Sequence, residues 1–138
     1  SPFVVGDELR FYYSGRTYRH SPYQGKDKGI SGGGIGLATI KRDRFVSLSA
    51  SFDGGHIITK PLNLKGRTLH LNAKSDYGEI LVKVIDQDDT VIAQSKPLKC
   101  DSLDAVVEWE EGNLDGLNGS VALQITLKNA LLFAVWCS

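Results

Sequence analysis

Apolar and polar residues alternate with a period of two along most of this sequence, and that period restricts the fold more than any other feature. In the segment SVALQITLK, Val121, Leu123, Ile125 and Leu127 fall on one face, and Ala122, Gln124, Thr126 and Lys128 fall on the other. Successive side chains of a strand point to opposite faces, so this pattern predicts a strand with one buried face. A helix would instead need apolar residues every three or four positions.

Two earlier segments, TLHLNAK and GEILVKVI, show the same alternation. Their apolar positions are Leu69, Leu71 and Ala73 in the first and Ile80, Val82 and Val84 in the second. The polar stretch at 87–89 predicts a turn that reverses the chain into a strand at Val91–Ala93, which makes a hairpin. We expect another strand in LDAVVEWEE and a final one in ALLFAVWC, whose apolar residues on both faces are typical of a central strand.

Short turn motifs separate these strands. They are Asp53-Gly54-Gly55, Leu64-Lys65-Gly66, Tyr77-Gly78, Glu111-Gly112-Asn113 and Leu117-Asn118-Gly119. About eight to ten short strands with turns at this spacing are typical of a β-sandwich or a jelly roll. We therefore predict an all-β protein, an antiparallel β-sandwich of jelly-roll type with almost no helix.

The charge balance and the hydropathy exclude several classes of partner. The 138 residues include 16 Lys plus Arg and 16 Asp plus Glu, which gives a formal net charge of +0. Nucleic-acid binding depends on net or strongly clustered positive charge, so we expect no nucleic-acid partner. No apolar run approaches the length of a membrane-spanning helix, so we expect no membrane partner. Because no basic and apolar leader opens the sequence, we expect a chain that is intracellular or already processed.

The N-terminal part differs from the rest, and we divide the chain into a segment at 1–44 and a sandwich at 45–138. Leu9–Tyr13 has the pattern of a strand, and a glycine-rich loop, GKDKGISGGGIG, leads from it to a second strand. We predict that Leu9–Tyr13 pairs with Gly36–Ile40 and that this hairpin covers the sandwich, because an isolated apolar hairpin is marginal in water. The chain is then a monomer. A dimer that exchanges this hairpin is the alternative.

No carboxylate pair or metal cluster emerges from the residue pattern, and we predict that the chain is not an enzyme, with a glycosidase as the third possibility. Glycoside hydrolysis needs two carboxylates that flank the scissile bond. Glu108 and Glu110 instead share the outward face of a strand, which is typical of a solvated acidic surface. The three histidines are scattered along the sequence, and no nucleophile motif accompanies them.

Metal and disulfide chemistry each leave two interpretations. Asp86, Asp88 and Asp89 have the carboxylate oxygens that calcium prefers, but Asp at a hairpin tip is more typical of turn geometry. We therefore expect no cofactor, with a structural calcium ion as the alternative. Cys100 and Cys137 either pair in an oxidising compartment or remain small buried apolar residues.

Four stretches of the sequence together resemble a known kind of module. DELRFYYSG and GGIGLATIKRDRFVSL are followed by ITKPLNLKGRTLHLNA and GEILVKVIDQDDTVI. This series resembles the C-terminal β-sandwich attached to five-bladed propellers related to glycoside hydrolase families 32 and 43. The resemblance covers nearly the whole chain and implies that residues 1–44 are the last strands of a propeller blade. It also implies that the catalytic carboxylates of such propellers lie in blades that this chain does not contain.

The resemblance implies a non-catalytic carbohydrate-binding module that recognises a polysaccharide or an oligosaccharide. Sugar rings stack on flat aromatic faces, and polar side chains beside the rings bind the hydroxyl groups. The first candidate surface is a loop with Arg16, Tyr18, His20 and Tyr23. The second is a polar sheet face with His70, Asn72, Lys83, Gln124 and Thr126, of which His70, Asn72 and Gln124 are our candidate binding residues.

Other interpretations of these residues stay open. The loop tyrosines can equally cover the sandwich edge, and the polar face can be ordinary solvated surface. Trp109 and Trp136 lie in apolar strand patterns, so we assign both to the core. Basic residues around the loop, namely Arg16, Arg19, Lys26 and Lys28, favour an anionic glycan.

The rival function is a structural accessory or interaction sandwich of a glycoside-hydrolase-like propeller protein, without a ligand of its own. In either case the resemblance implies a secreted protein, extracellular or periplasmic.

Overall fold

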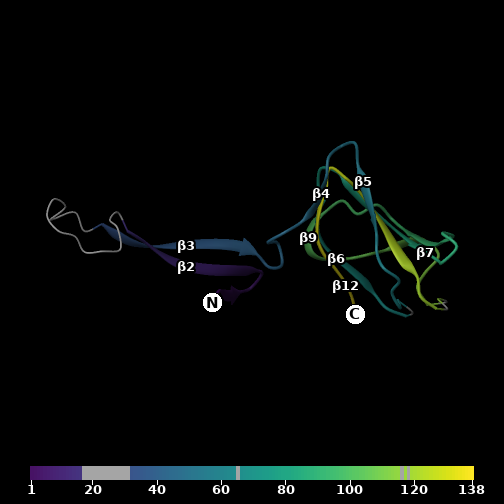
Figure 1. The fold of residues 1–138 in the computed structure, drawn as a ribbon, viewed down its shortest axis with the longest axis horizontal. Coiled ribbons are helices and arrows are strands. Elements are labelled where there is room, and N and C mark those ends of the chain that lie inside the picture. The colour runs from purple at the N-terminus through teal and green to yellow at the C-terminus, as the bar shows by residue number, and fades with distance from the viewer. Residues whose placement is uncertain (17–31, 65, 116, 118) are drawn as a thin grey trace. The chain divides into compact units, whose positions relative to one another are not determined.

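The computed structural model describes residues 1–16, 32–64, 66–115, 117 and 119–138. These residues form two compact units, Ser1–Arg42 and Asp43–Ser138 (Figure 1). Every regular element of the described residues is a β-strand, and every strand pairing is antiparallel. The predicted all-β antiparallel class is therefore confirmed. Within the described ranges, no helix is long or apolar enough to cross a membrane.

The first unit is a three-stranded sheet. It contains β1 (Phe3–Val5), β2 (Glu8–Arg16) and β3 (Gly33–Lys41), paired in that order. Leu9 pairs with Ile40 and Tyr13 with Gly36, which confirms the predicted pairing of these two strands. Gly6, at the turn between β1 and β2, has a φ of 59°, a conformation that glycine adopts without steric cost. Strand β1 was not predicted, because three residues are too few to show a period.

Both faces of this small sheet carry apolar side chains. On one face, Phe3 and Tyr12 meet edge to face, with their ring centroids 6.1 Å apart, and Leu37 lies beside Tyr12 in the register. On the other face, the Tyr13 ring lies across Gly36, where a Cβ atom would collide with it. Tyr12 and Tyr13 point to opposite faces, yet they are 60% and 58% exposed. Neither face is therefore buried in the way that a protein core is.

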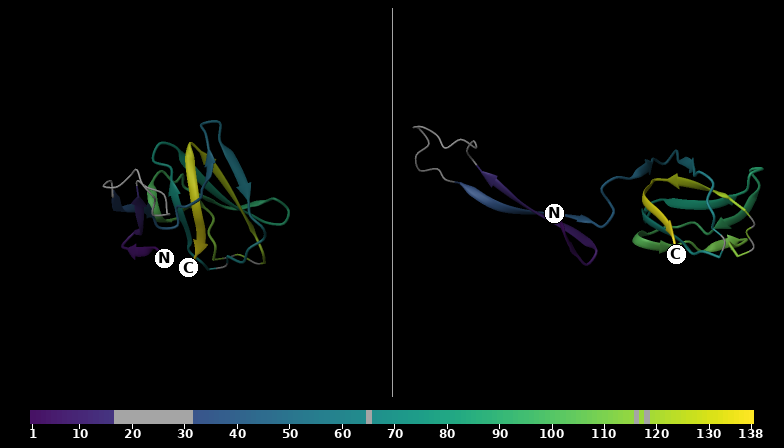
Figure 2. Two further views of the ribbon diagram at one scale, coloured as in Figure 1. Left: turned by 60° about the vertical axis from the view of Figure 1, so that its left-hand side comes forward. Right: turned by 60° about the horizontal axis from the view of Figure 1, so that its bottom comes forward.

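The second unit is a β-sandwich of two sheets. The five-stranded sheet has the order β10-β8-β7-β11-β5, and the four-stranded sheet has the order β4-β12-β6-β9. The strands of the first sheet are β5 (Gly55–Ile58), β7 (Glu79–Ile85), β8 (Val91–Ser95), β10 (Trp109–Glu111) and β11 (Ala122–Lys128). Those of the second are β4 (Leu48–Ala50), β6 (Leu69–Lys74), β9 (Asp101–Val106) and β12 (Ala130–Cys137). Figure 2 shows the same unit from two further directions.

The core lies between the two sheets and contains the residues that the period of two selects. Leu71 of β6, Val82 of β7 and Ile125 of β11 are all fully buried. The remaining predicted inward positions, Leu69, Ala73, Ile80, Val84, Val121, Leu123 and Leu127, are buried as well. Their burial confirms the predicted inward faces of these strands. The central place of β12, between β4 and β6, is also as predicted.

The predicted strand LDAVVEWEE is wrong as a single element. Its first half, β9, pairs with β6, whereas its second half, β10, pairs with β8 in the other sheet. The chain crosses between the sheets at Val107, which is 4% exposed and whose N–H donates to the carbonyl oxygen of Leu69. A continuous apolar pattern does not distinguish one long strand from two short ones that share a core. The jelly-roll topology stays a prediction.

Candidate ligand-binding surfaces

Two aromatic side chains stand exposed at the end of the sandwich where β6 leads into β7. Phe52 lies in the turn after β4 and is 69% exposed, and Tyr77 lies in the turn after β6 and is 80% exposed. Both line one hollow of about 480 Å³, together with Asp76, Gly78, Glu79, Lys99 and Lys128. We call this hollow, with its seven lining residues, the loop-end groove.

The groove continues into neighbouring hollows on the same unit. A second hollow of about 510 Å³ shares Phe52, Glu79 and Lys128 with it and extends along β5 past His56. A third, of about 200 Å³, shares Asp76 and Tyr77 with the groove and is also lined by Lys74 and Leu131. The two neighbouring hollows thus add polar side chains such as His56 and Lys74.

Asn129 fastens both aromatic turns. Its backbone N–H donates to the carbonyl oxygen of Ser51 over 2.8 Å, and its side-chain Nδ2 donates to the carbonyl oxygen of Tyr77 over 2.7 Å. Asn129 itself has a φ of 45°, a left-handed conformation that Asn tolerates better than most residues. At Gly78, a Cβ atom would collide with the carbonyl oxygens of Lys128 and Asn129. The turns that carry Phe52 and Tyr77 are therefore held by the β11–β12 connection.

The charges that line the groove are balanced. Asp76 and Glu79 supply carboxylates, and Lys99 and Lys128 supply ammonium groups. Lys99 Nζ lies 3.7 Å from Glu79 Oε2, an exposed ion pair that contributes little to stability. Such groups can bind hydroxyls as donors and as acceptors, and the groove has no excess of positive charge for an anionic ligand.

A second aromatic pair lies on the outward face of the four-stranded sheet. Trp136 of β12 stands opposite His70 of β6, with ring centroids 5.4 Å apart and ring planes only 12° from parallel. His70 Nδ1 lies 2.6 Å from Asp104 Oδ1, and His70 Nε2 lies 2.9 Å from Ser138 Oγ. We call Trp136, His70, Asp104 and Ser138 the Trp136 platform.

The order of carboxylate, imidazole and hydroxyl in this platform is that of a nucleophilic triad, but such a site also needs a group that binds an oxyanion. Acyl transfer requires N–H donors that stabilise an oxyanion beside the nucleophile. The N–H of Ser138 donates to the carbonyl oxygen of Thr68, and the N–H of Thr68 donates to that of Ser138. Both donors are thus engaged, and Asp104 is 60% exposed rather than buried behind the histidine. We interpret the contacts of His70 with Asp104 and Ser138 as structural, because they fix the His70 ring against Trp136.

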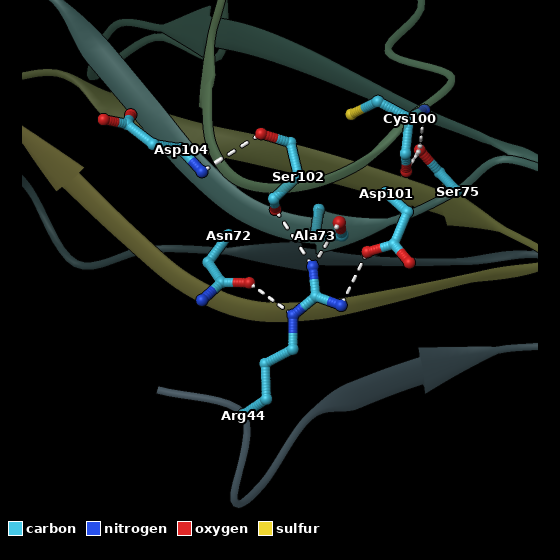
Figure 3. A network of polar contacts seen from close by, with 8 residues as sticks. All are labelled: Arg44, Asn72, Ala73, Ser75, Cys100, Asp101, Ser102 and Asp104. Carbon is cyan, nitrogen blue, oxygen red and sulfur yellow. Dashed lines mark hydrogen bonds and ion pairs between the residues drawn. The ribbon is translucent and has the colours of Figure 1, made fainter. Parts of the chain in front are cut away.

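Arg44 binds the last two strands of the same sheet, β6 and β9 (Figure 3). Its Nε donates to Asn72 Oδ1 over 2.9 Å, and its Nη1 donates to Asp101 Oδ1 over 2.6 Å. Its Nη2 donates to the carbonyl oxygens of Ala73 and Ser102, at 3.1 Å each, so that one guanidinium joins β6 to β9. This arrangement coincides with a register shift between β6 and β9, where Leu71 and Ala73 are paired on either side of an irregularity. The role of Arg44 is structural.

The structure separates the residues of the predicted polar face. His70 and Asn72 lie on the four-stranded sheet, whereas Lys83, Gln124 and Thr126 lie on the five-stranded sheet. The prediction of one shared face is therefore wrong, because alternation within a strand says nothing about which sheet the strand joins. Asn72 is 2% exposed and accepts from Arg44, and Gln124 pairs with Lys83 in the register of β11 and β7.

The predicted loop surface falls largely outside the described residues. Tyr18, His20 and Tyr23 lie there, and so do the basic residues Arg19, Lys26 and Lys28. Arg16 is described and is exposed at the end of β2, in the first unit.

Trp136 was assigned to the core, and that prediction is wrong. It is 37% exposed, because β12 has a register shift between Leu132 and Ala134 and Trp136 pairs with the outward-facing His70. Trp109, by contrast, packs against the core as predicted.

Sequence reasoning also missed Phe52 and Tyr77. Each is an aromatic residue inside a turn motif, SFDGG or SDYGE, where turn geometry does not require an aromatic side chain.

The acidic turn is a hairpin tip, and the two cysteines do not form a disulfide. Asp86 Oδ1 accepts the N–H groups of Asp88 and Thr90, as expected for a hairpin tip that Asp stabilises. Cys100 and Cys137 are both free thiols near opposite ends of β6: Cys137 pairs with Leu69, and Asp101, next to Cys100, pairs with Lys74. Burial raises the pKa of both thiols.

Comparisons with known proteins assign no function to these surfaces. No protein-family model, no curated protein and no solved structure matches the chain.

Proposed function

We propose that the sandwich is a non-catalytic carbohydrate-binding module that binds a polysaccharide through the loop-end groove. The observation that carries the proposal is the pair of exposed rings, Phe52 and Tyr77, on one hollow bordered by carboxylates and ammonium groups. A pyranose ring has apolar C–H faces and a polar rim, so it fits a surface that combines flat rings with hydrogen-bonding groups.

The rigidity of the groove supports binding. Asn129 fixes the turns of both rings through hydrogen bonds of 2.8 and 2.7 Å. A surface that is ordered before the ligand arrives loses less conformational entropy when the ligand binds. The balanced charges of the groove favour a neutral glycan over an anionic one, which differs from the expectation based on the basic loop.

Affinity gels that contain neutral or acidic polysaccharides test this proposal, with Phe52→Ala and Tyr77→Ala as variants. We expect the unmodified chain to be retarded by at least one neutral polysaccharide and each variant to lose about tenfold in affinity, or about 1.4 kcal/mol. Phe45→Ala is the matched control, because Phe45 is 61% exposed on the same unit and does not line the groove. The proposal fails if no polysaccharide retards the chain, or if Phe45→Ala weakens retention as much as Phe52→Ala does.

A second candidate function is favoured by the first unit. We propose as the alternative that the chain is an accessory domain of a glycoside-hydrolase-like propeller protein, without a ligand of its own. The three-stranded sheet has exposed apolar residues on both faces, such as Val4 at 65% and Ile35 at 83%. Other strands or layers that covered these residues would stabilise the sheet. The last strands of a propeller blade, separated from the rest of the blade, would expose apolar faces in the same way.

Removing residues 1–42 separates the two functions. If the accessory function holds, the full chain self-associates or binds a hydrophobic dye, whereas the shortened chain is a monomer and binds no polysaccharide. If the carbohydrate-binding function holds, the shortened chain keeps its retardation in the gels. Light scattering after gel filtration gives the mass in each case.

A further inference from the structure

We infer that the Trp136 platform is a second sugar-binding position, so that the module binds a polysaccharide at two points and prefers long chains to short ones. The inference rests on the proposed carbohydrate-binding function and adds a site, a binding mode and a class of ligand to it.

The platform presents a broad surface made from three neighbouring strands. Trp136 of β12, His70 of β6 and Val106 of β9 lie in one row across the sheet, since His70 pairs with both of the others. Trp136 and Val106 are 37% and 52% exposed at the two ends of this row. An apolar surface on the outward side of a sheet has a cost in water that a stacked sugar ring would offset.

The polar groups of the platform are placed for hydroxyl recognition. Asp104 uses one carboxylate oxygen to hold His70 and is 60% exposed, so its other oxygen can accept from a ligand. The His70 side chain is only 13% exposed, and both of its ring nitrogens are engaged by Asp104 and Ser138. The imidazole therefore acts as a positioning residue whose fixed ring stacks on Trp136, and it does not itself bind the ligand.

The two positions lie on the same unit and are connected by one strand. His70, Asn72 and Lys74 alternate on the side of β6 that faces away from Leu69, Leu71 and Ala73, and Arg44 covers the buried Asn72 between the other two. Lys74 lines the third hollow, which shares Asp76 and Tyr77 with the loop-end groove. From His70 to Lys74 the strand rises about 13 Å, at about 3.3 Å per residue. An extended polysaccharide can span such a distance, whereas a mono- or disaccharide occupies one position at a time.

Two-point binding has a consequence that a single site does not share. Once one part of a polymer is bound, the second contact forms at a high effective concentration, so affinity rises steeply with chain length. A single groove gives an affinity that stops rising once the groove is filled.

The test uses size ladders of gluco-, xylo-, manno- and fructo-oligosaccharides, with calorimetry and tryptophan fluorescence as readouts. We expect long oligosaccharides to bind at least tenfold more tightly than short ones, and Trp136→Ala to remove this dependence while short oligosaccharides bind as before. Trp109 packs against the core, so a shift in emission on binding that Trp136→Phe removes reports the platform alone. Asp104→Ala, at an exposed position, should weaken the length dependence, and Asp104→Asn should largely preserve it.

The outcomes distinguish this inference from the proposed function. If Phe52→Ala abolishes binding and Trp136 emission never responds to any oligosaccharide, the groove is the whole site and the inference is overturned. If no ladder binds, both proposals fail. If Trp136 emission responds in a chain that carries both Phe52→Ala and Tyr77→Ala, the platform binds sugar without the groove.

Discussion

Strands β2 and β11 share the same sequence period, but their side chains lie in different surroundings. In β11, Leu123 and Ile125 are fully buried between two sheets. In β2, Tyr12 and Tyr13 point to opposite faces of a three-stranded sheet and remain 60% and 58% exposed. The difference shows that alternation specifies a strand, whereas burial needs a second layer, which the sandwich contains within its own unit and the N-terminal sheet does not. Matched substitutions in the two units test this contrast.

Shortening one isoleucine in each unit should lower the free energy of unfolding strongly in the second unit and hardly at all in the first. Ile125→Ala should lower the free energy of unfolding by about 2–5 kcal/mol, because it leaves a cavity in a packed core. Ile35→Ala, at a position that is 83% exposed, should change it by no more than about 0.5 kcal/mol. Urea unfolding followed by tryptophan fluorescence and circular dichroism measures both. A loss above about 2 kcal/mol for Ile35→Ala would mean that another layer covers the first unit, and the contrast would disappear.

Replacing an arginine should also cost more stability in the second unit than in the first. Arg44→Met removes four hydrogen bonds from a side chain that is 8% exposed, and it should cost about 2–3 kcal/mol. Arg10→Met breaks an exposed pair with Glu8 at 3.4 Å and should cost less than about 1 kcal/mol. High salt should reduce the effect of Arg10→Met further and leave that of Arg44→Met nearly unchanged. Equal costs for the two variants would contradict the structural role of Arg44.

The turn at Asn129 should respond to substitution more than the turn at Gly6. Asn129→Ala loses the bond to Tyr77 and strains a left-handed residue, so we expect a loss of about 1–2 kcal/mol in the sandwich. Asn129→Gly removes the same bond, but glycine adopts the left-handed conformation without strain, so the loss of stability should be smaller. Ligand affinity at the groove should still fall. Gly6→Ala strains only the first unit and should leave the melting temperature of the sandwich unchanged, as differential scanning calorimetry would show. A lower melting temperature for Gly6→Ala would show that the two units unfold together.

The thiols should give the smallest effect, a change in reaction rate rather than in stability. Burial raises the pKa of Cys100 and Cys137, so less thiolate is present at pH 8 and both should react with Ellman's reagent more slowly than free cysteine. The rate should rise as the pH increases above 9.0, the ordinary value, and should reach that of free cysteine in urea. Both thiols lie in the second unit, so Ile125→Ala should speed the reaction and Ile35→Ala should not. Fast labelling of the unmodified chain at pH 8 would contradict this prediction.

The sequence by itself determined several strands of the sandwich and the inward faces of β6, β7 and β11. The period of two placed Leu71, Val82 and Ile125 in the core, because side chains of a strand alternate whatever the rest of the fold does. The pairing of Leu9–Tyr13 with Gly36–Ile40 also followed from local pattern. Turn chemistry placed Asp86 at a hairpin tip, where its carboxylate accepts backbone N–H groups.

Only the tertiary structure decided which strands share a sheet and which side chains therefore meet. His70 and Gln124 looked alike in the sequence but lie on different sheets, and Trp136 left the core because a register shift turned it toward His70. Phe52 and Tyr77 are 25 residues apart in the sequence and line one hollow because Asn129, from a third segment, binds both of their turns. Register, sheet order and turn packing are long-range choices that depend on the whole chain, so no local period contains them.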